Sequence, residues 1–129
     1  MNTMPQDKYI PGVCNIGPAE IKSRMQTGWF GLVLTVIIGA LLFYLEASPV
    51  TRLVLFLPAF IGAIGFLQAY FHFCVAFGSQ GLFNVANEAG KTESVTQQEF
   101  RKKDQQKVYK ITIYSVLIAA VVAVVASVI

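Results

Sequence analysis

Charged side chains are scarce in this sequence: they make up 13% of its 129 residues, against 55% hydrophobic residues. A typical soluble domain is about 25% charged. A soluble protein of this length cannot hide so much apolar surface from water. The composition therefore excludes an ordinary soluble domain and indicates that lipid surrounds most of these side chains. The length leaves no room for a second domain of ordinary size, so residues 1–129 form one predicted unit.

The motifs of common enzymes and cofactor sites are missing as well. The sequence contains no glycine-rich phosphate loop, no His-Glu-x-x-His and no Gly-x-Ser-x-Gly. Its two cysteines, Cys14 and Cys74, are too few for a disulfide framework and lack the close Cys-x-x-Cys spacing of a structural zinc site. We therefore expect a protein without enzymatic activity, metal or cofactor.

Acidic residues are absent from three long apolar runs, residues 28–45, 53–78 and 111–129. About 20 helical residues cross the hydrocarbon core of a bilayer, and lipid requires each backbone polar group to be paired within its own segment. The runs therefore predict an all-α integral membrane protein with three transmembrane helices, residues 79–110 forming a loop before the third. Without an intramembrane carboxylate, an ordinary proton- or cation-driven transporter is disfavoured.

Prolines mark the expected helix boundaries. Pro18 and Pro49 stand where a first helical residue is favoured, and Ser48 is a good N-cap for the second helix. The first two helices then form a tight antiparallel hairpin, because only one or two residues separate them. Pro58 removes one intrahelical hydrogen bond, which predicts a bend in the second span. Residues 96–99 fit a capping box at the start of the third helix.

Basic residues predict the orientation. All Lys and Arg except Arg52 fall within residues 1–27 and 79–110. By the positive-inside rule these two segments are cytoplasmic, and the hairpin turn and Ile129 lie on the far side. The same rule explains the net charge of +3 without a nucleic-acid partner.

Polar side chains inside a span usually contact protein or water. Gln68 and His72 are four residues apart and share a face of the predicted second helix, with Gly65 on the same stripe. They form a candidate intramembrane polar site. It can be an interhelical hydrogen bond, or it can line a small channel or transporter formed by oligomerisation.

Cys14 and Cys74 form a candidate thiol site on the predicted cytoplasmic side. Their pairing requires the turn at residues 14–17 to fold back over the end of the second helix. Cations such as Lys22 and Arg24 lower the pKa of a nearby thiol, whereas apolar surroundings raise it. Because Cys74 has apolar neighbours in the sequence, we expect Cys14 to be the more reactive of the two. The alternative is that both are small buried hydrophobic residues.

Small residues recur at helical spacing in the second and third spans. Lipid provides no hydrophobic drive for helix association, so packing depends on close approach of backbones at such residues. This packing can occur within the chain or with other chains. The candidate positions are Gly62, Gly65, Ala119, Ala123 and Ser127.

Residues 14–78 resemble the two-helix membrane domain of inner-membrane rhodaneses. That domain opens with Asn-x-Gly, an acid followed by Arg, a second Arg and a Gly. The matching residues here are Asn15, Gly17, Glu20, Arg24 and Gly28, and the second Arg position is poorly matched. It closes with Gly-Phe-Cys-Pro-x-Tyr, matched at Phe73 and Cys74 but with Val75 for Pro and Phe77 for Tyr. The third span of this chain has no counterpart in that domain, and the rhodanese catalytic loop has no counterpart in this sequence. The resemblance implies a bacterial inner-membrane hairpin, able to dimerise, near sulfur chemistry.

We therefore expect a small polytopic membrane protein that acts as a structural or interaction subunit of a larger membrane assembly or a homo-oligomer. Its partners are the lipid bilayer and other membrane proteins. Two alternatives stay open. One is a channel or transporter built around the Gln68/His72 face, and the other is a membrane thiol or sulfur-handling protein that uses Cys14 and Cys74.

Overall fold

The computed structural model describes residues 9–84 and 93–129. Part of the predicted loop (residues 85–92) and the first eight residues lie outside the described chain, and with them Lys91 and Lys8, which contributed to the predicted orientation. The elements in chain order are α1 (Pro18–Tyr44), α2 (Pro49–Arg52), the 3-10 helix η2 (Leu53–Leu55), α3 (Phe56–Phe71), α4 (Val75–Gln80), β1 (Leu82–Phe83), β2 (Glu93–Ser94) and α5 (Gln98–Val128).

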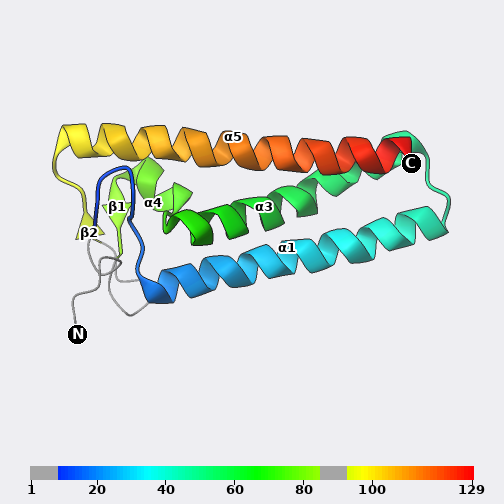
Figure 1. Cartoon of the computed structure of the whole chain (residues 1–129), viewed down its shortest axis with the longest axis horizontal. Helices are drawn as coiled ribbons and strands as arrows, with labels where there is room; N and C mark the ends of the chain where they lie inside the picture. Colours follow the sequence, from blue (N-terminus) through cyan, green and yellow to red (C-terminus); the bar gives the residue numbers. More distant parts are fainter. Residues whose placement is uncertain (1–8, 85–92) are drawn as a thin grey trace.

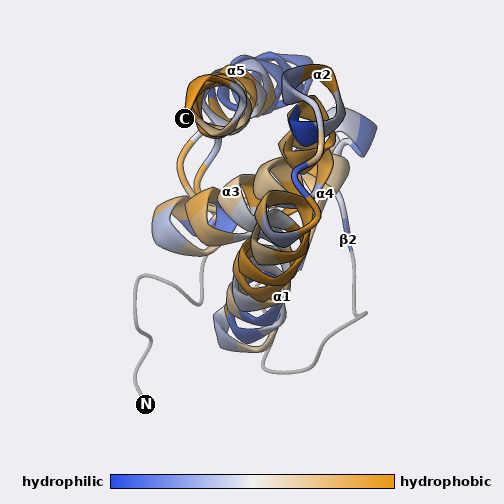
Figure 2. Cartoon of the chain, turned by 90° about the vertical axis from the view of Figure 1, so that its right-hand side faces the viewer, coloured by the Kyte–Doolittle hydropathy of each residue, from blue (hydrophilic) through white to orange (hydrophobic). Residues whose placement is uncertain are grey.

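Three long helical segments lie side by side along the molecule, with α3 between α1 and α5 (Figure 1). The segments Pro18–Tyr44, Pro49–Phe71 and Gln98–Val128 are each long and apolar enough to cross a membrane. This confirms the three predicted apolar helices. Only 11% of the most apolar window of the first segment is buried within the chain. Apolar residues run along all three helices (Figure 2), so they expose far more apolar surface than a water-soluble monomer tolerates.

Both helices of the hairpin begin where the sequence predicts, but the turn is longer: α1 ends at Tyr44, so residues 45–48 separate it from α2 instead of one or two. Pro18 and Pro49 are the first residues of α1 and α2. The Ser48 hydroxyl accepts a hydrogen bond from the Thr51 N–H at 3.3 Å, so it caps α2. Glu46 adopts a left-handed conformation with φ 55° and turns the chain between the two helices. Local sequence signals are therefore sufficient to place the two helix starts.

A 3-10 helix, η2, lies just before Pro58, and the bend predicted there stays a prediction. Proline has no N–H to donate to the carbonyl four residues earlier, which here is Val54, inside η2. A short 3-10 turn is a common way to accommodate such a missing bond. The segment from α2 to α3 thus remains continuous in helical form but changes its winding one turn before the proline.

The second span ends earlier than predicted. α3 stops at Phe71, because His72 adopts a left-handed conformation with φ 55° and ψ 44°. Cys74 is extended, and the separate short helix α4 follows. The expected continuous helix over residues 53–78 is therefore corrected to one that ends at Phe71. No glycine or proline marks this break in the sequence, and its cause is tertiary, as described below.

α5 starts with a polar part and continues without interruption into its apolar part, as predicted. The predicted capping box over residues 96–99 is wrong. Gln97 is the N-cap residue, and its side chain makes no capping hydrogen bond. The start of α5 is instead held by the Arg101 guanidinium, whose Nε donates to the Val95 carbonyl at 2.7 Å, while the Val95 N–H bonds to the Gly81 carbonyl.

α1 and α3 pack backbone against backbone at glycines. A Cβ atom added to Gly31 would collide with the Gly62 backbone, and one added to Gly65 would collide with the Gly28 backbone. Such close approach is the usual packing mode of helices in lipid. Gly62 and Gly65 are thus occupied by contacts within the chain.

The small residues of α5 are mostly occupied within the chain too. Ala119 and Ala123 are buried, and α5 packs along α3 and η2. Ser127 is partly exposed and donates its hydroxyl to the Val124 carbonyl of its own helix at 2.8 Å. Among the predicted packing residues, Ser127 and Gly62 keep a surface for other contacts, Gly62 because it also lines a groove described below.

Candidate functional site

Polar residues gather at one end of the molecule, at the left of Figure 1. We call this end the polar cap and define it as residues 9–24, 72–84 and 93–110. Its strands β1 and β2 pair antiparallel, with Leu82 opposite Ser94. Four polar side chains are almost completely buried in the cap: Asn15, Glu20, Asn84 and Asp104. Buried polar groups are costly unless they are hydrogen-bonded, so their partners show what the cap is built to hold.

Asn15 replaces the helical hydrogen bonds that are lost where α3 ends. Its side-chain oxygen accepts from the Cys74 N–H at 2.6 Å, and its side-chain amide donates to the Cys74 carbonyl at 3.1 Å. Its backbone N–H bonds to the His72 carbonyl at 3.1 Å. The turn at residues 14–17 therefore folds back over the end of the second span, which is the arrangement that the thiol hypothesis required.

A chain of polar contacts connects α1 to the same break. The Asn84 side-chain amide donates to one carboxylate oxygen of Glu20 at 2.9 Å. The other oxygen of Glu20 pairs with Arg24 at 3.2 Å. A second guanidinium nitrogen of Arg24 lies 2.9 Å from Cys74 Sγ. The backbone of Asn84 also bonds to Asn15 and Gly17, so segments far apart in sequence share one network.

The two cysteines are both buried and both free, and their surroundings differ. Cys14 Sγ contacts the Ile16 carbonyl at 3.4 Å, and burial raises the pKa of the Cys14 thiol. Cys74 Sγ instead receives the Arg24 guanidinium. Of the two cysteines, Cys74 is therefore the one that contacts Arg24. Within residues 9–84 and 93–129, no group of three His, Cys, Asp or Glu residues could hold a metal ion.

Gln68 and His72 do not form the predicted shared face. The Gln68 side-chain oxygen accepts from the Val75 N–H at 2.7 Å, and its backbone carbonyl accepts from Phe73, so Gln68 bridges the break after α3. His72 is exposed and lines a shallow pocket beside the first turns of α1, together with Lys22 and Trp29. The prediction assumed a continuous helix, and the left-handed turn at His72 separates the two side chains.

Asp104 holds the N-terminal segment and was missed in the sequence analysis. Its carboxylate accepts from the Tyr9 hydroxyl at 2.6 Å and from the Gly12 N–H at 2.8 Å. Burial, together with the hydrogen bond to Asp104, raises the pKa of Tyr9 above its ordinary value. Nothing local in the sequence distinguishes Asp104 from Glu99, the other acid of α5, which is exposed.

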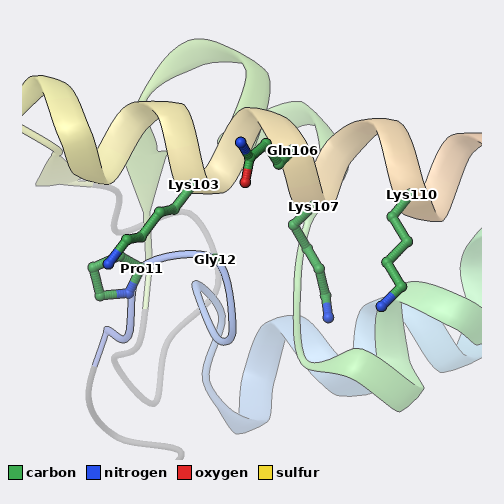
Figure 3. A pocket seen from close by; sticks show the side chains of 6 residues that line it. All are labelled: Pro11, Gly12, Lys103, Gln106, Lys107 and Lys110. Atoms are coloured by element: carbon green, nitrogen blue, oxygen red, sulfur yellow. The ribbon is translucent and has the colours of Figure 1, made fainter.

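Two concave surfaces lie beside these contacts. A basic pocket of about 290 Å³ lies between α5 and the N-terminal turn (Figure 3), lined by Pro11, Gly12, Lys103, Gln106, Lys107 and Lys110. An apolar groove of about 170 Å³ lies between the three long helices, lined by Leu32, Thr35, Ala59, Gly62, Ala63, Phe66, Ile118 and Val122.

Comparison of the chain with protein-family models, curated proteins and solved structures finds no match. The resemblance to the rhodanese membrane domain therefore remains a hypothesis that rests on the residues themselves. In the structure those residues are not scattered: Asn15, Glu20, Arg24 and Cys74 belong to one hydrogen-bonded network. These four residues close the polar cap onto the broken end of α3.

Proposed function

We propose that the chain is a small integral membrane protein that acts as a structural or interaction subunit of a membrane assembly. The three long apolar segments support its insertion, since their exposed side chains are mostly large and apolar. The basic residues of the polar cap support a cytoplasmic location for this end, with the hairpin turn on the far side. The membrane we propose is the bacterial inner membrane, because the rhodanese resemblance implies it.

The observation that carries this proposal is the apolar groove between α1, α3 and α5. Small residues of α3, among them Ala59 and Ala63, lie along it, and larger side chains such as Leu32 and Ile118 form its sides. Small residues allow the backbone of another helix to approach closely, which is how helices associate in lipid. The occupant we propose is an apolar transmembrane helix of a partner chain.

A matched pair of variants tests the groove. Thr35→Trp places an indole in the groove, whereas Val36→Trp adds the same group at an adjacent exposed position that does not line it. We expect the native protein, extracted from its membrane in mild detergent, to elute with a second chain. We expect Thr35→Trp to release that chain and Val36→Trp to retain it. A native particle that is strictly monomeric, with no co-purifying protein, would overturn the proposal.

The orientation is tested with an impermeant thiol reagent in intact cells, in a background where both native cysteines are replaced by serine. A single cysteine at Ser48, in the hairpin turn, is expected to react from outside. A single cysteine at Lys102, in the polar cap, is expected to react only after the cells are opened. The opposite labelling pattern would reverse the proposed topology.

A second candidate function, thiol chemistry at the membrane, is favoured by the contact between Arg24 and Cys74. Reactive cysteines generally lie beside a cationic side chain. If Cys74 is a functional thiol, a variant that retains Cys74 alone is expected to be alkylated faster by iodoacetamide than one that retains Cys14 alone. Arg24→Gln is expected to remove this difference. Equal and slow alkylation of both thiols would leave them as buried packing residues.

A further inference from the structure

The basic pocket is built mainly by one face of α5. Lys103, Lys107 and Lys110 follow each other at intervals of four and three residues, which places them on the same side of a helix. Figure 3 shows all three side chains projecting from α5 to the side where the turn at Pro11 and Gly12 lies. Three ammonium groups are therefore brought to the same concave surface.

None of these lysines is neutralised by an acid that the structure describes. Asp104 lies between them in sequence, but its carboxylate is turned to Tyr9 and Gly12 and does not line the pocket. The ammonium group of Lys107 lies 4.3 Å from the centre of the Phe71 ring. A cation is attracted to an aromatic face, which opposes the burial and the charge of Lys110 that lower the pKa of Lys107. The pocket thus keeps an uncompensated positive charge.

The opposite wall of the pocket is fixed before any ligand binds. Gly12 has a positive φ of 71°, and its N–H is held by Asp104. A Cβ atom added to Gly12 would lie 3.1 Å from Cβ of Lys103, so the turn packs directly against α5. A preformed wall reduces the ordering cost of binding.

We propose that this pocket binds the phosphate headgroup of an anionic phospholipid. Phosphate oxygens are strong acceptors for several ammonium groups at once. Lys110 directly precedes Ile111, where the apolar part of α5 begins, and Phe71 is the last residue of α3. With the helices inserted, the pocket lies at the depth of the headgroups. Clusters of lysines at this depth attract anionic lipids, each by a modest amount.

A free phosphate ion offers the same oxygens, and position favours the lipid. A headgroup in the bilayer is held beside the pocket at high local concentration, whereas a soluble phosphate is not. If the lysines served only to set the orientation of the chain in the membrane, every lysine of the cap would contribute equally to lipid binding. Lys102 provides that control, because it is on the same helix and exposed but does not line the pocket.

The test uses the full chain in mild detergent and counts bound lipid by native mass spectrometry. The probes are dioctanoyl phosphatidylglycerol, dioctanoyl phosphatidylcholine and inorganic phosphate. We expect the anionic lipid to bind at a concentration about tenfold lower than the zwitterionic one. Simultaneous replacement of Lys103, Lys107 and Lys110 by glutamine is expected to abolish this preference, and Lys102→Gln is expected to retain it.

A variant that keeps the positive charge separates the loss of lipid binding from a folding defect. Replacement of the same three lysines by arginine is expected to preserve the preference, and Lys107→Gln alone is expected to reduce it partly. Equal binding of the two lipids by the native chain, or an equal loss in Lys102→Gln, would overturn the site. Displacement of the lipid by inorganic phosphate at similar concentration would overturn the assignment to lipid. The readout concerns single chains and does not depend on the proposed assembly.

Discussion

The interface between α1 and α3 and the polar cap stabilise the same chain in opposite ways. α1 and α3 come into backbone contact at positions where both helices carry glycine, which has no side chain: Gly31 contacts Gly62, and Gly28 contacts Gly65. In the cap the contacts are polar and specific, and those that hold the broken end of α3 and the N-terminal segment join residues far apart in sequence, as between Asn15 and Cys74. Close packing of two helices in lipid needs only small residues at the contact. A non-helical backbone needs a hydrogen-bond partner for each N–H and carbonyl that the helix no longer pairs.

This difference also separates the positions that tolerate change from those that do not. A glycine in a backbone contact cannot accept one carbon atom, although a glycine elsewhere in the same helix can. A cap residue fails when its hydrogen-bond partners are left unsatisfied, whatever its volume. The predictions below test each side of this comparison, beginning with the largest expected effect.

Gly31→Ala is expected to destabilise the protein most. The new Cβ has no room against the Gly62 backbone, and overpacking of this kind costs about 3 kcal/mol or more when the backbone cannot move. Gly39→Ala is the control, because its Cβ would lie 3.6 Å from the nearest atom of Leu55, an ordinary contact. That change is expected to alter the free energy of unfolding by less than about 1 kcal/mol. Thermal unfolding in detergent measures both, and equal effects would contradict the glycine interface.

Asn15→Ala is expected to have an intermediate effect. It leaves the buried N–H of Cys74 without a partner, at a cost of about 1–3 kcal/mol, whereas the Cys74 carbonyl keeps its bond from the Gly78 N–H. Hydrogen exchange is expected to increase specifically at residues 72–75. Thr96→Ala is the matched control, because the capping box predicted there does not form, and its effect is expected to be within about 0.5 kcal/mol. A larger effect at Thr96 than at Asn15 would reverse the account of the cap.

Tyr9→Phe is expected to have the smallest effect at neutral pH and a distinct effect at alkaline pH. Folding raises the pKa of Tyr9 above its ordinary value, so the protonated phenol is favoured in the folded state. Its contribution to stability is complete below a pH of about 10, the ordinary pKa of tyrosine, and is lost as the pH rises further. Unfolding followed between neutral and strongly alkaline pH is expected to show this additional loss in the native chain only. If the stability of the two proteins changed in parallel with pH, the Tyr9 hydroxyl would not contribute to the stability of the cap.

The candidate site was only partly predictable. Cys14, Cys74, Gln68 and Arg24 were singled out from their types and positions, and all four lie in or beside the polar cap. Their roles changed, because the prediction continued α3 through His72. Once α3 ends at Phe71, Gln68 bonds to the broken backbone, Arg24 contacts Cys74, and His72 faces outward. Asp104 was not anticipated, since nothing local distinguishes it from an exposed acid of a basic helix.

Local physical chemistry was enough to determine the three apolar helices and the starts of the first two. A continuous apolar run requires helical hydrogen bonding in lipid. Pro18 and Pro49 have no N–H that would need a partner in the first turn, and Ser48 caps α2 by accepting from the Thr51 N–H. None of these features depends on a distant residue. They could therefore be inferred from the sequence alone.

The end of α3 and the polar cap were decided only by the tertiary structure. A left-handed conformation at His72 has no glycine to favour it, and the backbone groups that it frees are satisfied by Asn15, 59 residues before Cys74. The carboxylate of Asp104 is likewise buried only because Tyr9 and Gly12 approach from the other end of the chain. A group whose hydrogen-bond partner is that remote has no local signal, because its energy depends on a contact that exists only after folding.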